Sequence, residues 1–184
     1  MMMFFFNLVG WFMNSWIMIW LMMEVTFFVF MSCFSSMKNY NFSESVLKYF
    51  LIQLIFSMSF LGLVLIWFFN ISMDLTFFLF IIVLGKLNIF PLHFWLFSIL
   101  GKLSWLVFFS MSTFMKLYPL LMISYSLHFY SVLLIFLLSS LMGCMMGLNH
   151  SSLQKILGFT SMMYMSWMLI SLLCSLQMFF FFFF

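Results

Sequence analysis

A lysine and a proline interrupt a long apolar stretch of this chain. The stretch runs from about residue 74 to residue 100, with Lys86 near its middle and Pro91 five residues later. A lysine at the centre of a bilayer costs roughly 2.5–3.5 kcal/mol, and a proline removes a helix hydrogen bond that lipid cannot replace. Broken helices occur at membrane depth where they are packed in protein or line a wet cavity. Residues 84–95, LGKLNIFPLHFW, therefore predict a discontinuous helix with a buried ionisable group, as in transporters and pumps.

The composition places the whole chain in a membrane. Apolar residues make up 68% of it and charged residues 5%, whereas globular domains carry roughly 25% charged residues. We expect an all-α, polytopic membrane helix bundle that forms a single transmembrane domain over residues 1–184. A net charge of +3, dispersed along the chain, excludes a nucleic-acid surface. The 32 Phe and 22 Met favour an organelle-encoded protein from an AT-rich genome.

The apolar segments predict about six to seven transmembrane helices, since a span needs ~20 apolar residues. Residues 1–13 are too short to span alone and are interpreted as a half-span, an interfacial helix or a tilted extension of the next helix. Ser43 is the predicted cap of the second long helix. The expected long helices cover residues 15–36, 44–69, 74–100 with a break at 89–91, 103–125, 129–148, and 153 into the 170s.

Charges in the loops divide into two groups if the helices alternate in direction. One side then carries an excess of lysine and faces the matrix or cytoplasm by the positive-inside rule. That side holds Lys38, Lys48, Lys102, His150 and Lys155, with Glu44 as its acid, and the other side holds Asp74 and His128.

Three charges remain inside the membrane: Glu24, Lys86 and Lys116. Intramembrane ionisable residues are functional candidates by default. Burial disfavours the charged form of a side chain and a neighbouring opposite charge favours it, so a buried lysine beside a glutamate is a switchable proton site. Lys116 would be the next proton acceptor. His93, just past the break, is a candidate relay, and Asn88 a candidate anchor for water.

Structural interpretations of the same residues stay open at this stage. Glu24 and Lys86 would also fit a pair that only neutralises two charges. Lys116 would fit a side chain that extends to the interface, and His93 a hydrogen-bonded packing residue. The chain contains no Gly-rich phosphate loop, nucleophile triad, haem-ligand pair or CxxC motif. We therefore expect no catalytic residue, no cofactor-binding residue and no metal site.

The broken segment LGKLNIFPLHFW resembles a segment of the NADH dehydrogenase subunit 2 family, the antiporter-like proton-pumping subunits of respiratory complex I. Four further segments resemble that family in the same order: its Glu-bearing helix, the helix after it, the second lysine helix, and the following loop and helix. They are Trp16–Phe27, Ser43–Gln53, Leu103–Tyr125 and Gly147–Leu169. The LN-x₅-KIL form of the last segment favours subunit 2 over its sister subunits.

The resemblance implies a role for each buried charge. Glu24 would be the modulating glutamate, Lys86 the lysine on the broken helix and Lys116 the connecting lysine. It also implies the inner mitochondrial membrane and, as partners, lipid and the other membrane-arm subunits. NADH, FMN, iron–sulfur clusters and ubiquinone would belong to other subunits. A cation/proton antiporter component and a structural scaffold subunit are the alternative functions.

Some positions depart from the family pattern. The family has Pro-Glu shortly after its HFW, where this chain has Phe97 and Ser98. Gln154 replaces a basic residue, and Tyr164 a common His. The family continues into a second inverted repeat, whereas this chain corresponds to one repeat plus one helix. We therefore expect either a truncated sequence or a split protein whose second half is a separate chain.

Overall fold

Long apolar runs fold as helices in this chain because lipid offers no hydrogen-bond partner, so each segment must satisfy its own backbone. The computed structural model describes residues 2–12, 15–34, 40–69, 75–125 and 129–174. Its helices are α1 (Met2–Trp11), α2 (Trp16–Phe34), α3 (Tyr40–Phe68), α4 (Leu75–Leu87), α5 (Phe94–Leu100), α6 (Trp105–Ser112), α7 (Phe114–Tyr125), α8 (Phe129–Leu148) and α9 (Leu153–Cys174).

The predicted helices are found, with three differences in detail. α3 begins at Tyr40, so Ser43 lies inside the helix and its prediction as the cap is wrong. α1 is a separate ten-residue helix that packs against α2 and α7, and it is therefore not an extension of α2. The predicted helix over 103–125 is divided into α6 and α7 at Thr113.

The surface of the bundle is apolar and several polar side chains are inside it. Among the described residues, four helical stretches are long and apolar enough to cross a membrane: Ser43–Phe68, Trp105–Tyr125, Phe129–Leu148 and Leu153–Cys174. On α3 the outward side chains Leu51, Ile55 and Met58 are each more than half exposed. Lys86, Asn88, His93 and Lys116 are buried in contrast. This distribution suits a lipid exterior, and the chain is a multi-pass membrane helix bundle.

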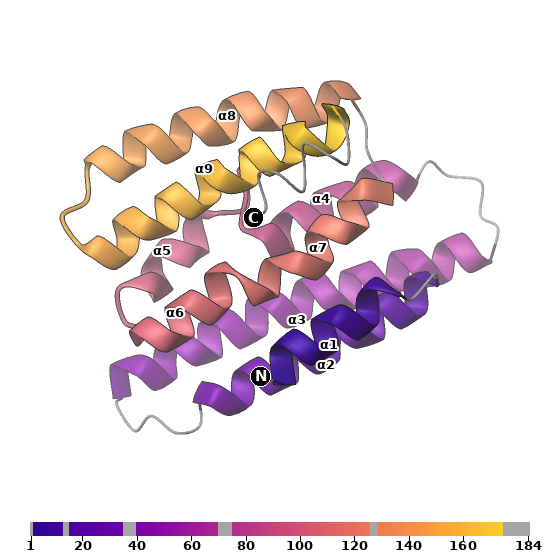
Figure 1. Ribbon diagram of the computed structural model, residues 1–184, viewed down its shortest axis with the longest axis horizontal. Helices are drawn as coiled ribbons and strands as arrows, with labels where there is room; N and C mark the ends of the chain where they lie inside the picture. The colour runs from indigo at the N-terminus through magenta and orange to yellow at the C-terminus, as the bar shows by residue number, and fades with distance from the viewer. Residues whose placement is uncertain (1, 13–14, 35–39, 70–74, 126–128, 175–184) are drawn as a thin grey trace.

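The helices run side by side along the long axis of the bundle (Figure 1). α8 and α9 form a hairpin along one face, with α1 and α2 towards the opposite face (Figure 1). α7 lies between them, in contact with α1, α2, α4 and α6. The larger apolar cluster joins α2, α3, α4, α7, α8 and α9, and it includes Phe60, Phe80 and Ile123. Lys86 lies between Leu84 and Leu87, which both belong to this cluster.

One end of the bundle gathers the lysines that were predicted to share a side. Glu44 forms ion pairs with Lys48 at 2.6 Å and with Lys102 at 3.2 Å. Lys155, at the start of α9, lies against Gly101 in the α5–α6 connection. The predicted co-location of these lysines is confirmed. Lys38, Asp74 and His128 lie outside the described residues.

Candidate functional site

The end of α4 is closed by a residue in the left-handed conformation. Asn88 has φ 62°, which asparagine adopts more readily than most residues. The Asn88 amide N–H donates to the Gly85 carbonyl at 3.3 Å, and the Ile89 N–H donates to the Leu84 carbonyl at 3.2 Å. These are the two hydrogen bonds of a Schellman motif. The helix therefore ends at Leu87, one residue after Lys86 and before Pro91 is reached.

The chain between α4 and α5 forms the predicted break. Residues 88–93 are not helical, and α5 begins at Phe94. Ile89 is fully buried, whereas Pro91 is exposed on the outside of the bundle. A proline has no N–H, so its exposure to lipid leaves no donor without a partner. The predicted helix break at Pro91 is confirmed, and Lys86 occupies the last turn before it.

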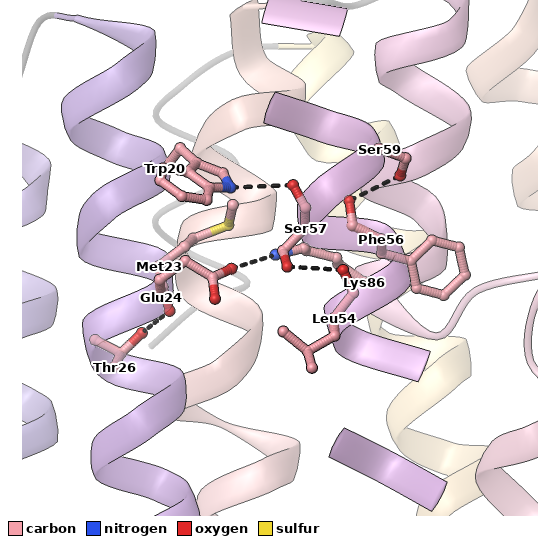
Figure 2. Close-up of polar contacts among 9 residues, drawn as sticks. All are labelled: Trp20, Met23, Glu24, Thr26, Leu54, Phe56, Ser57, Ser59 and Lys86. Atoms are coloured by element: carbon pink, nitrogen blue, oxygen red, sulfur yellow. Dashed lines mark hydrogen bonds and ion pairs between the residues drawn. The ribbon is translucent and has the colours of Figure 1, made fainter. Parts of the chain in front are cut away.

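Glu24 and Lys86 meet across the bundle. The Lys86 Nζ lies 3.5 Å from the Glu24 Oε1, and the two side chains are 7% and 12% exposed. Figure 2 shows the carboxylate of α2 directed at the lysine of α4, beside Ser57 on α3. The Trp20 indole N–H donates to the Ser57 carbonyl at 3.1 Å, which ties α2 to α3 one turn from Glu24. Lys86 also lies at a helix C-terminal end, where the helix dipole is favourable to a cation.

A glycine lets α3 approach α4 closely beside Lys86. A Cβ at Gly85 would lie 2.5 Å from two carbon atoms of the Phe56 ring, much closer than van der Waals contact allows. The Phe56 ring therefore covers the α4 backbone directly. The contact fixes the last turn of α4, and so the position from which the Lys86 side chain reaches Glu24.

A cavity of about 30 Å³ adjoins the Glu24–Lys86 pair. Roughly 10–15 Å³ of such free volume holds one water molecule. Its walls include both charged side chains, Thr26 and Gln53, with Pro119 on the α7 side. Gln53 is 8% exposed and was not among the predicted site residues. A lone amide inside the apolar run LIQLIF is the sequence signal that could have identified it.

Lys116 lies in the first turn of α7, just after the interruption at Thr113. It is 4% exposed. Its Nζ donates to the Ser161 hydroxyl at 3.2 Å and contacts the Ser161 carbonyl at 3.5 Å. The interpretation that Lys116 extends to the interface is therefore wrong, because its ammonium bonds to α9 inside the bundle. Ser161 was not predicted, since one serine among many carries no distinguishing signal.

Lys116 borders a second cavity of about 10 Å³. Asn88 and Ser161 lie in its walls together with apolar side chains of α5 and α6. The first cavity reaches Met115 and Pro119 on α7. The residues on either side of Lys116 in α7 thus border the cavity of the Glu24–Lys86 pair, while Lys116 itself borders the other.

His93 is fully buried among aromatic rings. Its ring centroid lies 4.3 Å from that of Phe94, 5.5 Å from Phe97 and 5.6 Å from Phe90. Within the described part of the chain, neither of its ring nitrogens has a hydrogen-bond partner. His93 lines neither the Glu24–Lys86 cavity nor the Lys116 cavity. The structure therefore places Glu24 beside Lys86 at one cavity and Asn88 with Lys116 at the other, and it leaves His93 apart from both.

These features define a class of protein: a multi-pass membrane bundle with a buried glutamate–lysine pair on a broken helix and a second buried lysine nearby. The described residues contain no group of three or more His, Cys, Asp or Glu side chains that would hold a metal ion. The glutamate and the two lysines can gain and lose protons, which is the chemistry that this arrangement of side chains allows.

Sequence comparison then identifies the particular relatives of the chain as NADH-ubiquinone oxidoreductase chain 2. The protein of that name from Anopheles gambiae is 32% identical over 87% of this chain and 49% of its own length. The Artemia franciscana protein is 33% identical over 86% of this chain and 50% of its own length, and the Coturnix japonica protein 31% over 85% and 49%. No protein-family model matches the chain.

The chain spans about half the length of the curated relatives it matches, and the half that it covers is their N-terminal part. The resemblance found in the sequence is therefore confirmed over most of this chain.

Proposed function

We propose that this chain is the N-terminal part of a proton-translocating membrane subunit of respiratory complex I. The observation that carries the proposal is the Glu24–Lys86 contact at the end of a broken helix, with a cavity beside it. A lone buried charge in lipid is expensive, and a scaffold would be as stable or more stable with apolar residues in place of the pair. A buried Glu24–Lys86 pair is explained if its protonation state changes during function.

In this proposal Lys86 alternates between two states. Paired with Glu24 it holds its proton, and when the contact lengthens it passes the proton towards Lys116. The contact of 3.5 Å is long for a charge-assisted hydrogen bond, which suits a pair that separates. Glu24 modulates the lysine and Lys116 receives the proton. The energy comes from NADH oxidation and ubiquinone reduction in other subunits.

The proposal extends to location and partners. The protein would lie in the inner mitochondrial membrane and contact other membrane-arm subunits. The C-terminal half of the relatives, which this chain does not cover, would supply the exit path for protons. That half would come from a separate chain or from a longer form of this one. Native electrophoresis of mildly solubilised membranes, stained for NADH dehydrogenase activity, tests the membership. Mass spectrometry should find this chain in the active band, and its absence there would refute the proposal.

Replacing Lys86 with methionine tests the proton role. Lys86→Met keeps the length of the side chain and removes its proton, so we expect proton translocation per NADH oxidised to fall several-fold. Assembly should remain largely intact, because the Glu24 carboxyl left behind can take up a proton. The measurement is acidification by the reconstituted complex. Lys102→Met, the same change at an exposed lysine in the α5–α6 connection, is the matched control and should pump normally. Normal proton translocation by the Lys86→Met variant would refute the proposed role of Lys86 in proton transfer.

A further inference from the structure

The side chain of Asn88 carries a polar group into the interior that the break itself does not require. A left-handed residue that closes a helix is most often glycine, and the Schellman hydrogen bonds use only backbone atoms. Asn88 is nevertheless 4% exposed. Its Oδ1 is buried and has no hydrogen-bond partner among the described residues. A buried acceptor without a partner costs about 1–3 kcal/mol, so a ligand for this oxygen is expected.

The cavity beside Asn88 has the size and the polarity for one small polar molecule. Its volume of about 10 Å³ is close to the minimum that holds a water molecule. Four polar side chains lie in its walls: Asn88, Ser112, Lys116 and Ser161. Buried water typically makes 2–4 hydrogen bonds. The remaining walls are apolar side chains of α5 and α6: Leu96, Leu100, Phe108 and Met111.

The donors and acceptors in the walls are complementary through a water molecule. A lysine ammonium has three donors and no acceptor, and the Lys116 Nζ contacts the Ser161 hydroxyl at 3.2 Å and the Ser161 carbonyl at 3.5 Å. In the described residues Lys116 forms no ion pair. Asn88 Oδ1 needs a donor. A metal cation does not suit the cavity, because the Lys116 ammonium lies in its wall.

We infer that Asn88 and Lys116 together bind one water molecule, which donates to Asn88 Oδ1 and accepts from Lys116 Nζ. The inference rests on the proposed proton role of Lys116 and extends it. Asn88 is then a positioning residue, because it orients the water and exchanges no proton itself. The water accepts a hydrogen bond from the Lys116 ammonium and donates one to Asn88 Oδ1, so it fixes the direction of one Lys116 N–H bond without itself gaining or losing a proton. The end of the broken helix is thereby coupled to Lys116.

The test compares the wild-type complex with Asn88→Gly, Asn88→Asp and Ser112→Ala. Glycine accepts the left-handed backbone and so keeps the end of α4, while it removes the amide. Aspartate tolerates the same backbone and keeps an oxygen in place. Ser112 lines the same cavity, but its hydroxyl already donates to the Phe109 carbonyl at 3.0 Å, so it is the matched control. Water is located by cryo-electron microscopy at a resolution that shows buried waters, and proton translocation is measured on the same preparations.

We expect a water peak within hydrogen-bond distance of Asn88 Oδ1 in the wild type and Ser112→Ala. In Asn88→Gly the peak should be lost or displaced, and proton translocation should fall several-fold with unchanged assembly. Asn88→Asp should retain more translocation than Asn88→Gly, which a purely structural role of the side chain would not predict. A map with other buried waters but none at Asn88 would overturn the inference, as would full translocation by Asn88→Gly. If Lys86→Met pumps normally, the proposed function fails, whereas the water peak still decides whether the site exists.

Discussion

At the scale of single residues, the Glu24–Lys86 pair is the feature with the largest energetic consequence. Removing one partner of a buried ion pair typically costs 3–5 kcal/mol because the other charge stays buried without compensation, whereas replacing both by apolar groups is often neutral or stabilising. Lys86 is 9% exposed as a residue and its side chain 7%. The free energy of unfolding is therefore expected to fall when one partner is replaced and to recover when both are replaced.

The prediction concerns Glu24→Gln alone and together with Lys86→Met. The single variant leaves the lysine ammonium unpaired in the interior, so the free energy of unfolding and the amount of assembled protein should fall. The double variant should recover the stability lost by Glu24→Gln and still fail to translocate protons. Thermal unfolding in detergent and quantitative native gels measure the first property, and vesicle acidification measures the second. Equal stability of single and double variants would show that the pair is not energetically coupled.

The sequence predicted the charged residues of the site but not the polar side chains Gln53 and Ser161 beside them. Glu24, Lys86 and Lys116 were found because a charge in lipid is costly wherever its segment lies. Gln53 was missed although it is a lone amide in an apolar run, and Ser161 was missed because it is one serine among many until the tertiary structure brings it to a cavity. The sequence predicted that Asn88 anchors a water molecule. Its left-handed backbone conformation is visible only in the structure.

At the scale of helices, the contact between α3 and α4 determines where Lys86 points. Gly85 lies under the Phe56 ring, whereas a Cβ at Gly62 on α3 would meet no atom within 4 Å beyond its chain neighbours and the backbone of its own helix. The two glycines therefore form a natural comparison, because the same added methyl group meets an aromatic ring at one position and open space at the other.

We predict that Gly85→Ala destabilises the protein and disturbs the pair, whereas Gly62→Ala does neither. A methyl group forced into a packed contact costs typically 1–3 kcal/mol, and here it would push α3 away from the turn that carries Lys86. Thermal unfolding and proton translocation, measured side by side, should both decrease for Gly85→Ala. Gly62→Ala should be neutral or slightly stabilising, because alanine favours a helix over glycine by ~1 kcal/mol. Identical behaviour of the two variants would contradict the packing argument.

The interruptions of the helices were predictable to different degrees. The break at Pro91 follows from the chemistry of proline, which has no N–H and a fixed φ. The interruption at Thr113 precedes Pro119 by six residues, and α7 continues through that proline. The position of the second interruption therefore depends on how α6 and α7 pack against α2, α4 and α9.

At the scale of the whole molecule, the apolar exterior predicts how charges are tolerated along one helix. Leu47 and Ile55 are two turns apart on the outward face of α3, 61% and 66% exposed. Ile55 lies near the middle of the Ser43–Phe68 span, and Leu47 lies beside Lys48 at the end that gathers lysines. Depth in the membrane is the main difference between these two exposed positions.

Ile55→Lys should impair membrane insertion, and Leu47→Lys should not. A lysine at the bilayer centre costs roughly 2.5–3.5 kcal/mol, whereas one near a helix end extends its ammonium to the interface. The fraction of protein resistant to carbonate extraction measures insertion for each variant. Efficient insertion of Ile55→Lys would mean that this face of α3 is not in contact with lipid in the assembled protein.

The sequence by itself determined the class of protein and the three buried charges, because hydrophobic length and the cost of a charge in lipid are properties of one segment at a time. Only the tertiary structure decided which polar groups meet. Glu24 and Lys86 are 62 positions apart, and Lys116 and Ser161 are 45 apart. Such contacts depend on the crossing of helices packed around α7, and no local pattern of residues encodes that geometry.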